Sequence, residues 1–97
     1  MTDLCNEIEK FGKGVGNASR YRIVEALFRG PKTVNQLVQA VRQSQPAVSQ
    51  HLKTLKASDI VTDRRRGQKV FYTLNTAYVL GLLKSLSQEV TRQRKRR

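Results

Sequence analysis

The chain has 97 residues, 38% of them hydrophobic, and its 19 lysines and arginines against seven acidic residues give a formal net charge of +12. A chain of this length forms one domain with a modest core, and a basic excess of this size favours a nucleic-acid partner. No segment approaches the roughly 20 apolar residues that cross a bilayer, and no basic region followed by an apolar run marks a signal peptide. We therefore expect a cytoplasmic protein that does not bind membranes.

The positive charge is unevenly distributed along the chain. Residues 1–30 carry five positive and four negative side chains, residues 31–75 carry eight and two, and residues 76–97 carry six and one. The excess begins in the middle segment, so we expect the surface that meets a polyanion there.

The N-terminal third has the pattern of two helices separated by glycines. Apolar residues at helical spacing predict a short amphipathic helix over residues 3–11. The glycines at positions 12, 14 and 16 then predict a linker or a frayed helix end. A second helix follows, with Asn17 or Ser19 as its N-cap, and Gly30-Pro31 ends it.

Two further helices joined by a short turn are predicted next. Thr33 and Gln36 form a T-x-x-Q capping box at the start of a helix that ends near Val41. After a turn over residues 42–44, Ser44 caps the following helix. Two helices with so short a connection form a helix-turn-helix.

The helix predicted over residues 44–57 has one apolar and one polar face. Val48, Leu52 and Leu55 stand at i, i+4 and i+7 and form the apolar stripe. The opposite face offers amides, hydroxyls and an ammonium group without any carboxylate, and such groups donate hydrogen bonds to purine edges and phosphate oxygens. A solvated polar face on an ordinary amphipathic helix is the alternative interpretation. The polar face consists of Pro46, Gln50 and Lys53, flanked by Ser49 and Thr54.

After this helix the sequence changes to the two-residue period of a β-hairpin. The β-prone runs 60–64 and 69–74 flank a turn that contains Gly67. Four cations without a counter-charge gather at its tip, and they are Arg64, Arg65, Arg66 and Lys69. A solvated charged tip is the alternative, but uncompensated like charges repel, which favours a wing that contacts phosphates or the minor groove.

Thr76 is predicted to cap the last helix, whose apolar residues at positions 79, 83, 86 and 90 keep a heptad-like spacing. The core of one small domain cannot bury all the apolar side chains of such a terminal helix. We predict that it pairs with its copy and with the first helix in a homodimer, the alternative being a helix absorbed by its own domain. Residues 1–90 then form the DNA-binding and dimerisation domain, and residues 91–97 form a mobile basic tail.

The ordered set of these elements resembles the ArsR/SmtB family of winged helix-turn-helix regulators. The resemblance is carried by the segments 17–27, 44–55 and 60–74. It implies a mainly α fold with a small antiparallel β-hairpin, in the order α-α-α-α-β-β-α, and a homodimer built from the first and last helices. It also implies recognition helices in successive major grooves, with Arg64 to Lys69 forming the wing. The implied base and backbone contacts come from Ser44, Gln45, Ser49, Gln50 and Lys53. His51 flanks the recognition helix, which favours packing or a hydrogen bond to a phosphate, with metal ligation as the less favoured alternative.

The chain departs from the sensor motifs of that family. Thr33 and Asn35 stand where many members have a metal-binding C-x-C motif, and the last helix has only Glu89 of the second metal site. We therefore expect no metal, no cofactor and no recognisable inducer site. The single cysteine, Cys5, excludes an intrachain disulfide, which leaves an interchain disulfide or a thiol adduct as redox roles. A cysteine that is simply part of the apolar stripe is the plainer interpretation.

No constellation of catalytic residues is recognisable, so the sequence predicts no enzyme. It predicts a sequence-specific transcriptional regulator, a repressor that binds an inverted-repeat operator in double-stranded DNA as a homodimer. Two alternatives remain open. One is a winged-helix module that binds a protein through its last helix, and the other is a non-specific nucleic-acid-binding protein driven by tail and wing.

Overall fold

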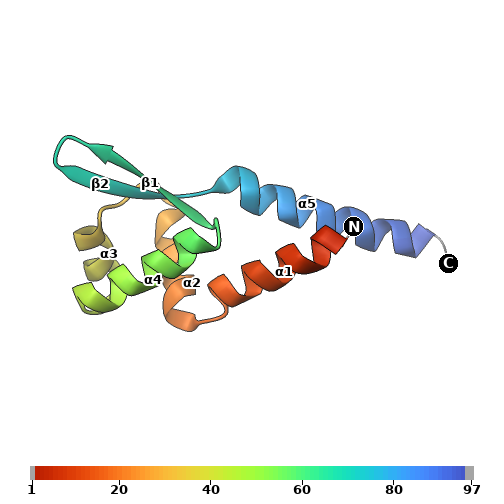
Figure 1. Cartoon of the computed structure of the whole chain (residues 1–97), viewed down its shortest axis with the longest axis horizontal. Coiled ribbons are helices and arrows are strands. Elements are labelled where there is room, and N and C mark those ends of the chain that lie inside the picture. Colours follow the sequence, from red (N-terminus) through yellow and green to blue (C-terminus); the bar gives the residue numbers. More distant parts are fainter. Residues whose placement is uncertain (1, 96–97) are drawn as a thin grey trace.

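The computed structural model describes residues 2–95, and the side chains of residues 4–94 (Figure 1). Five helices and a two-stranded antiparallel hairpin follow one another in the order predicted from the sequence, which confirms the winged helix-turn-helix architecture. The elements are α1 (Thr2–Val15), α2 (Ala18–Leu27), α3 (Val34–Val41), α4 (Gln45–Ala57), β1 (Val61–Arg66), β2 (Lys69–Leu74) and α5 (Thr76–Lys95).

The core lies between α2, α3, α4 and the base of the hairpin. Its largest fully buried side chains include Ile23, Leu37, Leu52, Leu55 and Ile60. Because α5 contributes only Leu82 to the buried set among the described residues, this helix is mostly outside the core. Figure 1 shows α5 and α1 running side by side away from the helix-turn-helix, in a molecule that measures 53 × 25 × 22 Å. No helix within residues 2–95 is long and apolar enough to span a membrane.

Helix α1 is longer than the sequence predicts. It continues to Val15 through Gly12 and Gly14, where we expected a linker or a frayed end. Gly14 is buried, and a Cβ built there would lie 2.5 Å from Ile60 Cδ1. The helix end is also capped from outside, since Arg20 Nε donates a hydrogen bond to the Gly14 carbonyl over 2.5 Å. Tertiary contacts of this kind outweigh the weak helix propensity of glycine.

The starts of α2, α3 and α4 follow the predicted caps. The side chain of Asn17, one of the two candidates, accepts a hydrogen bond from Arg20 N and begins α2. Thr33 and Gln36 form both hydrogen bonds of the capping box at α3. Ser44 Oγ accepts from Ala47 N and begins α4. These local side-chain bonds satisfy backbone N–H groups that the first helical turn leaves unpaired.

Helix α5 differs from the prediction at both ends. Its N-cap is Asn75 rather than Thr76, because the Asn75 side chain accepts a hydrogen bond from Tyr78 N over 3.3 Å. At the other end, residues 91–95 continue the helix instead of forming a mobile tail, supported by contacts from Glu89 to Arg92 and Gln93 at i+3 and i+4. The predicted division at residue 90 therefore falls within a helix, and residues 96–97 lie outside the described residues.

Candidate nucleic-acid interface

Helix α4 has one buried stripe and one exposed polar face. Val48, Leu52 and Leu55 are buried against the core, as their spacing predicts. Gln50 and Lys53 are exposed on the opposite side of the helix. Since the exposed face carries no carboxylate, it can approach DNA without electrostatic repulsion.

Gln45 and Ser49 lie one helical turn apart and bond to each other. The Gln45 Nε2 atom donates a hydrogen bond to Ser49 Oγ over 3.1 Å. Gln50, by contrast, makes no side-chain hydrogen bond with any other described residue, and its amide is exposed. Gln50 and Lys53 are therefore the expected contact residues of α4 whose exposed side chains have no partner in the described chain.

His51 lies away from this face. It is half-buried, and helical geometry turns it about 100° from Gln50, toward the side of the helix that approaches the core. Gln45, Ser49 and Lys53 stand at i, i+4 and i+8 along one side of α4, while Gln50 and His51 each lie further round the helix.

The hairpin arranges its cations on both of its faces. In the antiparallel register Arg64 pairs with Phe71, Arg65 with Val70 and Arg66 with Lys69. Strand β1 runs to Arg66, beyond the end at Arg64 that the sequence predicts, and a two-residue turn with Gly67 at φ 62° closes the hairpin. Because side chains alternate along a strand, Arg64, Arg66 and Lys69 share one face while Arg65 lies on the other.

Two contacts hold the hairpin against the helix-turn-helix. Lys56, in the last turn of α4, forms an ion pair of 2.8 Å with Asp63 of β1. Its hydrogen bond to Asp63 raises the pKa of Lys56 above the ordinary value, so the lysine stays charged at neutral pH. On the other strand, Tyr72 and Lys32 exchange two backbone hydrogen bonds of 2.9 and 2.8 Å. The wing is therefore attached to the last turn of α4 and to the segment that precedes α3.

Comparison with known proteins identifies the family. Residues 17–63 match the family model described as "Bacterial regulatory protein, arsR family". The chain is 38% identical to the HTH-type transcriptional regulator Rv2034 from Mycobacterium tuberculosis over 80 residues, which cover 82% of this chain and 75% of that protein. The chain belongs to the ArsR family.

One further relative and one solved structure are also similar to this chain. The ArsR-family chain is 33% identical to the transcriptional repressor SdpR from Bacillus subtilis, over 66% of its own length and 71% of that protein. Its fold matches the solution structure of the homodimeric winged helix-turn-helix DNA-binding domain Mb0332 from Mycobacterium bovis with a TM-score of 0.73 at 23% identity. That match covers 95% of this chain and 88% of the other.

The structure adds one candidate that the sequence did not single out. Arg42 ends α3 in the left-handed conformation, with φ 58°, and is exposed in the turn before the recognition helix α4 of this ArsR-family chain. Glycine is the usual residue in such a conformation because a Cβ is disfavoured there. The arginine side chain thus lies beside the interface at a cost in backbone energy. From the sequence, Arg42 could have been identified only by its positive charge and its position in the expected turn between the two helices.

The acidic residues of the middle segment are both engaged in ion pairs. Asp59 contacts Lys10 over 2.7 Å, and Asp63 contacts Lys56. These are the two carboxylates between residues 31 and 75. Because each is paired with a lysine, neither presents an uncompensated negative charge to DNA.

The sensor positions hold no recognisable constellation in the described part of the chain. Among the side chains of residues 4–94, no three His, Cys, Asp or Glu residues gather in a way that could hold a metal ion. Cys5 is a free, exposed cysteine on α1. A redox role for Cys5 stays a prediction, as does the expectation that the chain binds no metal.

Proposed function

We propose that this ArsR-family chain is a transcriptional repressor that binds double-stranded DNA sequence-specifically as a homodimer, acts in the cytoplasm and catalyses no reaction. Two recognition helices enter successive major grooves of an inverted repeat whose half-site centres lie about 10 to 10.5 base pairs apart. Bound across a promoter, the dimer excludes polymerase or a competing activator. The observation that carries this proposal is the exposed, carboxylate-free face of α4 beside a hairpin rich in arginine.

The proposal divides the interface into base contacts and backbone contacts. Gln45, Ser49 and Gln50 read base edges, because amides and hydroxyls match the donor and acceptor pattern of the major groove. Lys53, Ser44 and His51 contact the adjacent backbone. The hairpin cations Arg64, Arg65, Arg66 and Lys69 contact the phosphates that flank each half-site.

Exposed apolar residues on α5 support the homodimer. Leu83, Leu86 and Val90 are 49%, 40% and 54% exposed in the single chain, and Leu80 is 62% exposed. A continuous apolar surface of this kind marks an interaction site. The Mycobacterium bovis neighbour, which shares the fold, is described as homodimeric. Within this proposal residues 1–90 bind DNA and dimerise, and residues 91–97 are the basic C-terminal segment.

A selection of bound duplexes from a random DNA library at physiological salt tests the proposal. Enrichment of an inverted repeat is the expected result, because a two-fold dimer selects two-fold symmetric sites. Binding that depends on salt but enriches no motif would instead indicate a non-specific nucleic-acid-binding protein. No binding to duplex DNA at all would indicate a module that binds another protein.

Replacing Gln50 by alanine is expected to relax sequence specificity. A bidentate amide contact with a base contributes about 1–3 kcal/mol of discrimination, whereas random DNA offers no such contact. Titrations of the selected operator and of random duplex, with wild type and Gln50→Ala, measure the difference. Equal losses of affinity on both duplexes would remove Gln50 from the list of base-reading residues.

Replacing Arg42 by glycine is expected to have opposite effects on folding and on DNA binding. Glycine relieves the left-handed backbone, so stability rises by up to about 1 kcal/mol. Loss of a phosphate contact lowers the slope of log affinity against log salt by about 0.9 per protomer in contact. Thermal unfolding and salt titrations check the two effects. Arg42→Lys, which keeps both charge and Cβ, is the control, and an unchanged salt slope in Arg42→Gly would show that Arg42 does not touch DNA.

A further inference from the structure

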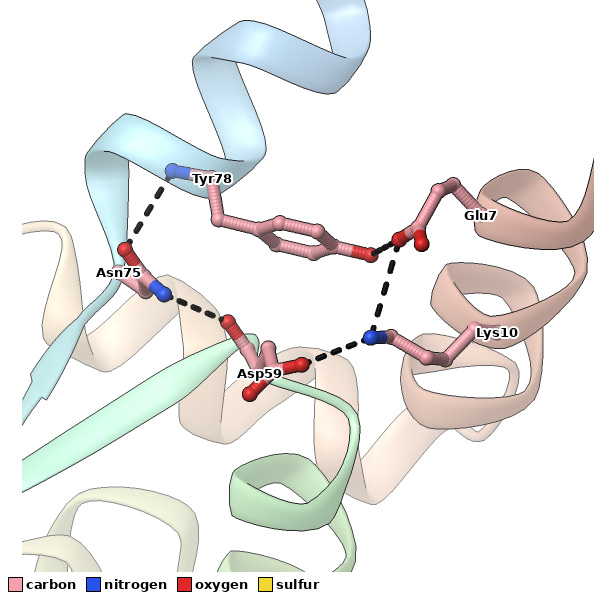
Figure 2. Close-up of polar contacts among 5 residues, drawn as sticks. All are labelled: Glu7, Lys10, Asp59, Asn75 and Tyr78. Atoms are coloured by element: carbon pink, nitrogen blue, oxygen red, sulfur yellow. Dashed lines mark hydrogen bonds and ion pairs between the residues drawn. The ribbon is translucent and has the colours of Figure 1, made fainter. Parts of the chain in front are cut away.

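Five polar residues from three distant parts of the chain meet where α4 passes into β1 (Figure 2). Two come from α1, one from the turn between α4 and β1, and two from the start of α5. We call this group the polar cluster, and its members are Glu7, Lys10, Asp59, Asn75 and Tyr78.

Asp59 is held by both flanking helices. Lys10 Nζ of α1 donates to Asp59 Oδ2 over 2.7 Å. Asn75 Nδ2, at the start of α5, donates to the Asp59 carbonyl oxygen over 2.9 Å. Asp59 itself has a left-handed backbone, with φ 63°. Asp59 reverses the chain between α4 and β1. It is therefore held by hydrogen bonds to both its side chain and its backbone.

Tyr78 connects α5 with α1 directly. Its hydroxyl donates to Glu7 Oε1 over 2.6 Å, and Lys10 Nζ lies 5.3 Å from the centre of its ring. Burial, and then the hydrogen bond to Glu7, raise the pKa of the Tyr78 hydroxyl above its ordinary value. The hydroxyl therefore keeps its proton and donates to Glu7 throughout the neutral range.

Helix α1 also packs closely against the same turn at Gly14. A Cβ built on Gly14 would lie 2.9 Å from Ser58 Oγ, besides its close approach to Ile60 Cδ1. Cβ atoms essentially never come this close to other atoms, so any larger residue at position 14 would force the side chains of Ser58 and Ile60 to shift. Helix α1 therefore packs closely against the turn that follows α4.

We propose that the polar cluster fixes the orientation of α4 and the wing relative to α1 and α5, and thereby sets the half-site spacing that the dimer accepts. The inference rests on the proposed function, in which α1 and α5 build the dimer. In such a dimer the two recognition helices are connected only through α1 and α5 of the two protomers. A change in the tilt of α4 relative to α1 and α5 therefore displaces the recognition helix of each protomer. Adding one base pair between half-sites displaces one of them by about 3.4 Å and rotates it by roughly 35°. A rigid connection therefore rejects neighbouring spacings, while a loose one tolerates them.

The test measures affinity for duplexes that carry two identical half-sites, with centres moved apart in steps of one base pair, and for a single half-site. Tyr78→Phe removes the hydrogen bond to Glu7, and Lys10→Met removes the ion pair with Asp59. Lys13→Met is the matched control, because it removes an equal charge and an ion pair, of 3.3 Å to Glu9, within α1 alone.

Both cluster variants are expected to lower the preference for the best spacing by about three- to tenfold, which lies within the roughly two- to thirtyfold by which substitutions alter coupling between two parts of a protein. Affinity for the single half-site should stay at the level of wild type and of Lys13→Met. An unchanged spacing profile would overturn the inference while leaving the proposed function intact, and so would an equal loss on the single half-site. If wild type itself prefers no spacing, the proposed function fails together with the inference.

Discussion

Replacing Leu83 by glutamate is expected to convert the protein into a monomer at micromolar concentration and to lower operator affinity by at least about a hundredfold. Leu83 is half-exposed in the single chain, so the charge does not enter the core. In a dimer the same position would bury a carboxylate against an apolar partner, which is strongly unfavourable. A monomer loses the gain from linked binding to two half-sites, which amounts to about 10²–10⁴ in affinity. Sedimentation and operator titration measure the two effects.

The matched control for this experiment is Gln88→Glu. Gln88 is exposed on the same helix, turned about 140° away from Leu83, and the substitution adds the same charge. It should leave both mass and affinity unchanged. If Leu83→Glu remained a dimer with normal operator affinity, the apolar stripe of α5 would not be the dimer interface.

Replacing Arg64, Arg65 and Arg66 together by glutamine is expected to weaken binding to every duplex by at least about a hundredfold at physiological salt. Each lost phosphate contact lowers the slope of log affinity against log salt by about 0.9, so the slope should fall by about three for each wing in contact. The enriched motif should not change, since phosphates carry no sequence information. Salt titrations on operator and random duplex measure the slope.

A charge-matched variant separates the wing from the general charge of the protein. Replacing Lys84, Arg92 and Arg94 by glutamine removes three positive charges from α5, which Figure 1 shows extending away from the hairpin. We expect the salt slope of this variant to change by less than about one, because these cations lie outside the proposed interface. Equal effects of the two triple variants would mean that net charge, and not the wing, provides the affinity.

The parts of the fold that depend on local chemistry follow from the sequence. The capping box at Thr33 and the caps at Asn17 and Ser44 involve residues only three positions apart. The polar face of α4 follows from helical periodicity alone. Local patterns of this kind predicted both the element order and most of the candidate interface.

The parts that depend on distant contacts do not follow from the sequence. The continuation of α1 through Gly14 requires the turn at residues 58–60, more than 40 positions away, to accept a backbone at close range. Tyr78 and Glu7 are 71 positions apart, and no periodicity relates them. The length of β1 likewise depends on its register with β2, which places Arg65 and Arg66 in the strand and not in the turn.

The bond between Gln45 and Ser49 bears on how the operator is distinguished from other DNA. In the protein without DNA, the Gln45 amide and the Ser49 hydroxyl are hydrogen-bonded to each other. Contact with bases would replace this hydrogen bond by others and would add little net free energy of binding. A wrong base, however, leaves opened donors and acceptors unpaired in a desolvated groove, where each costs about 1–3 kcal/mol. In the proposed interface, discrimination at these two positions would therefore arise as a penalty on incorrect sequences, and substitution of either residue would remove the hydrogen-bond partner of the other.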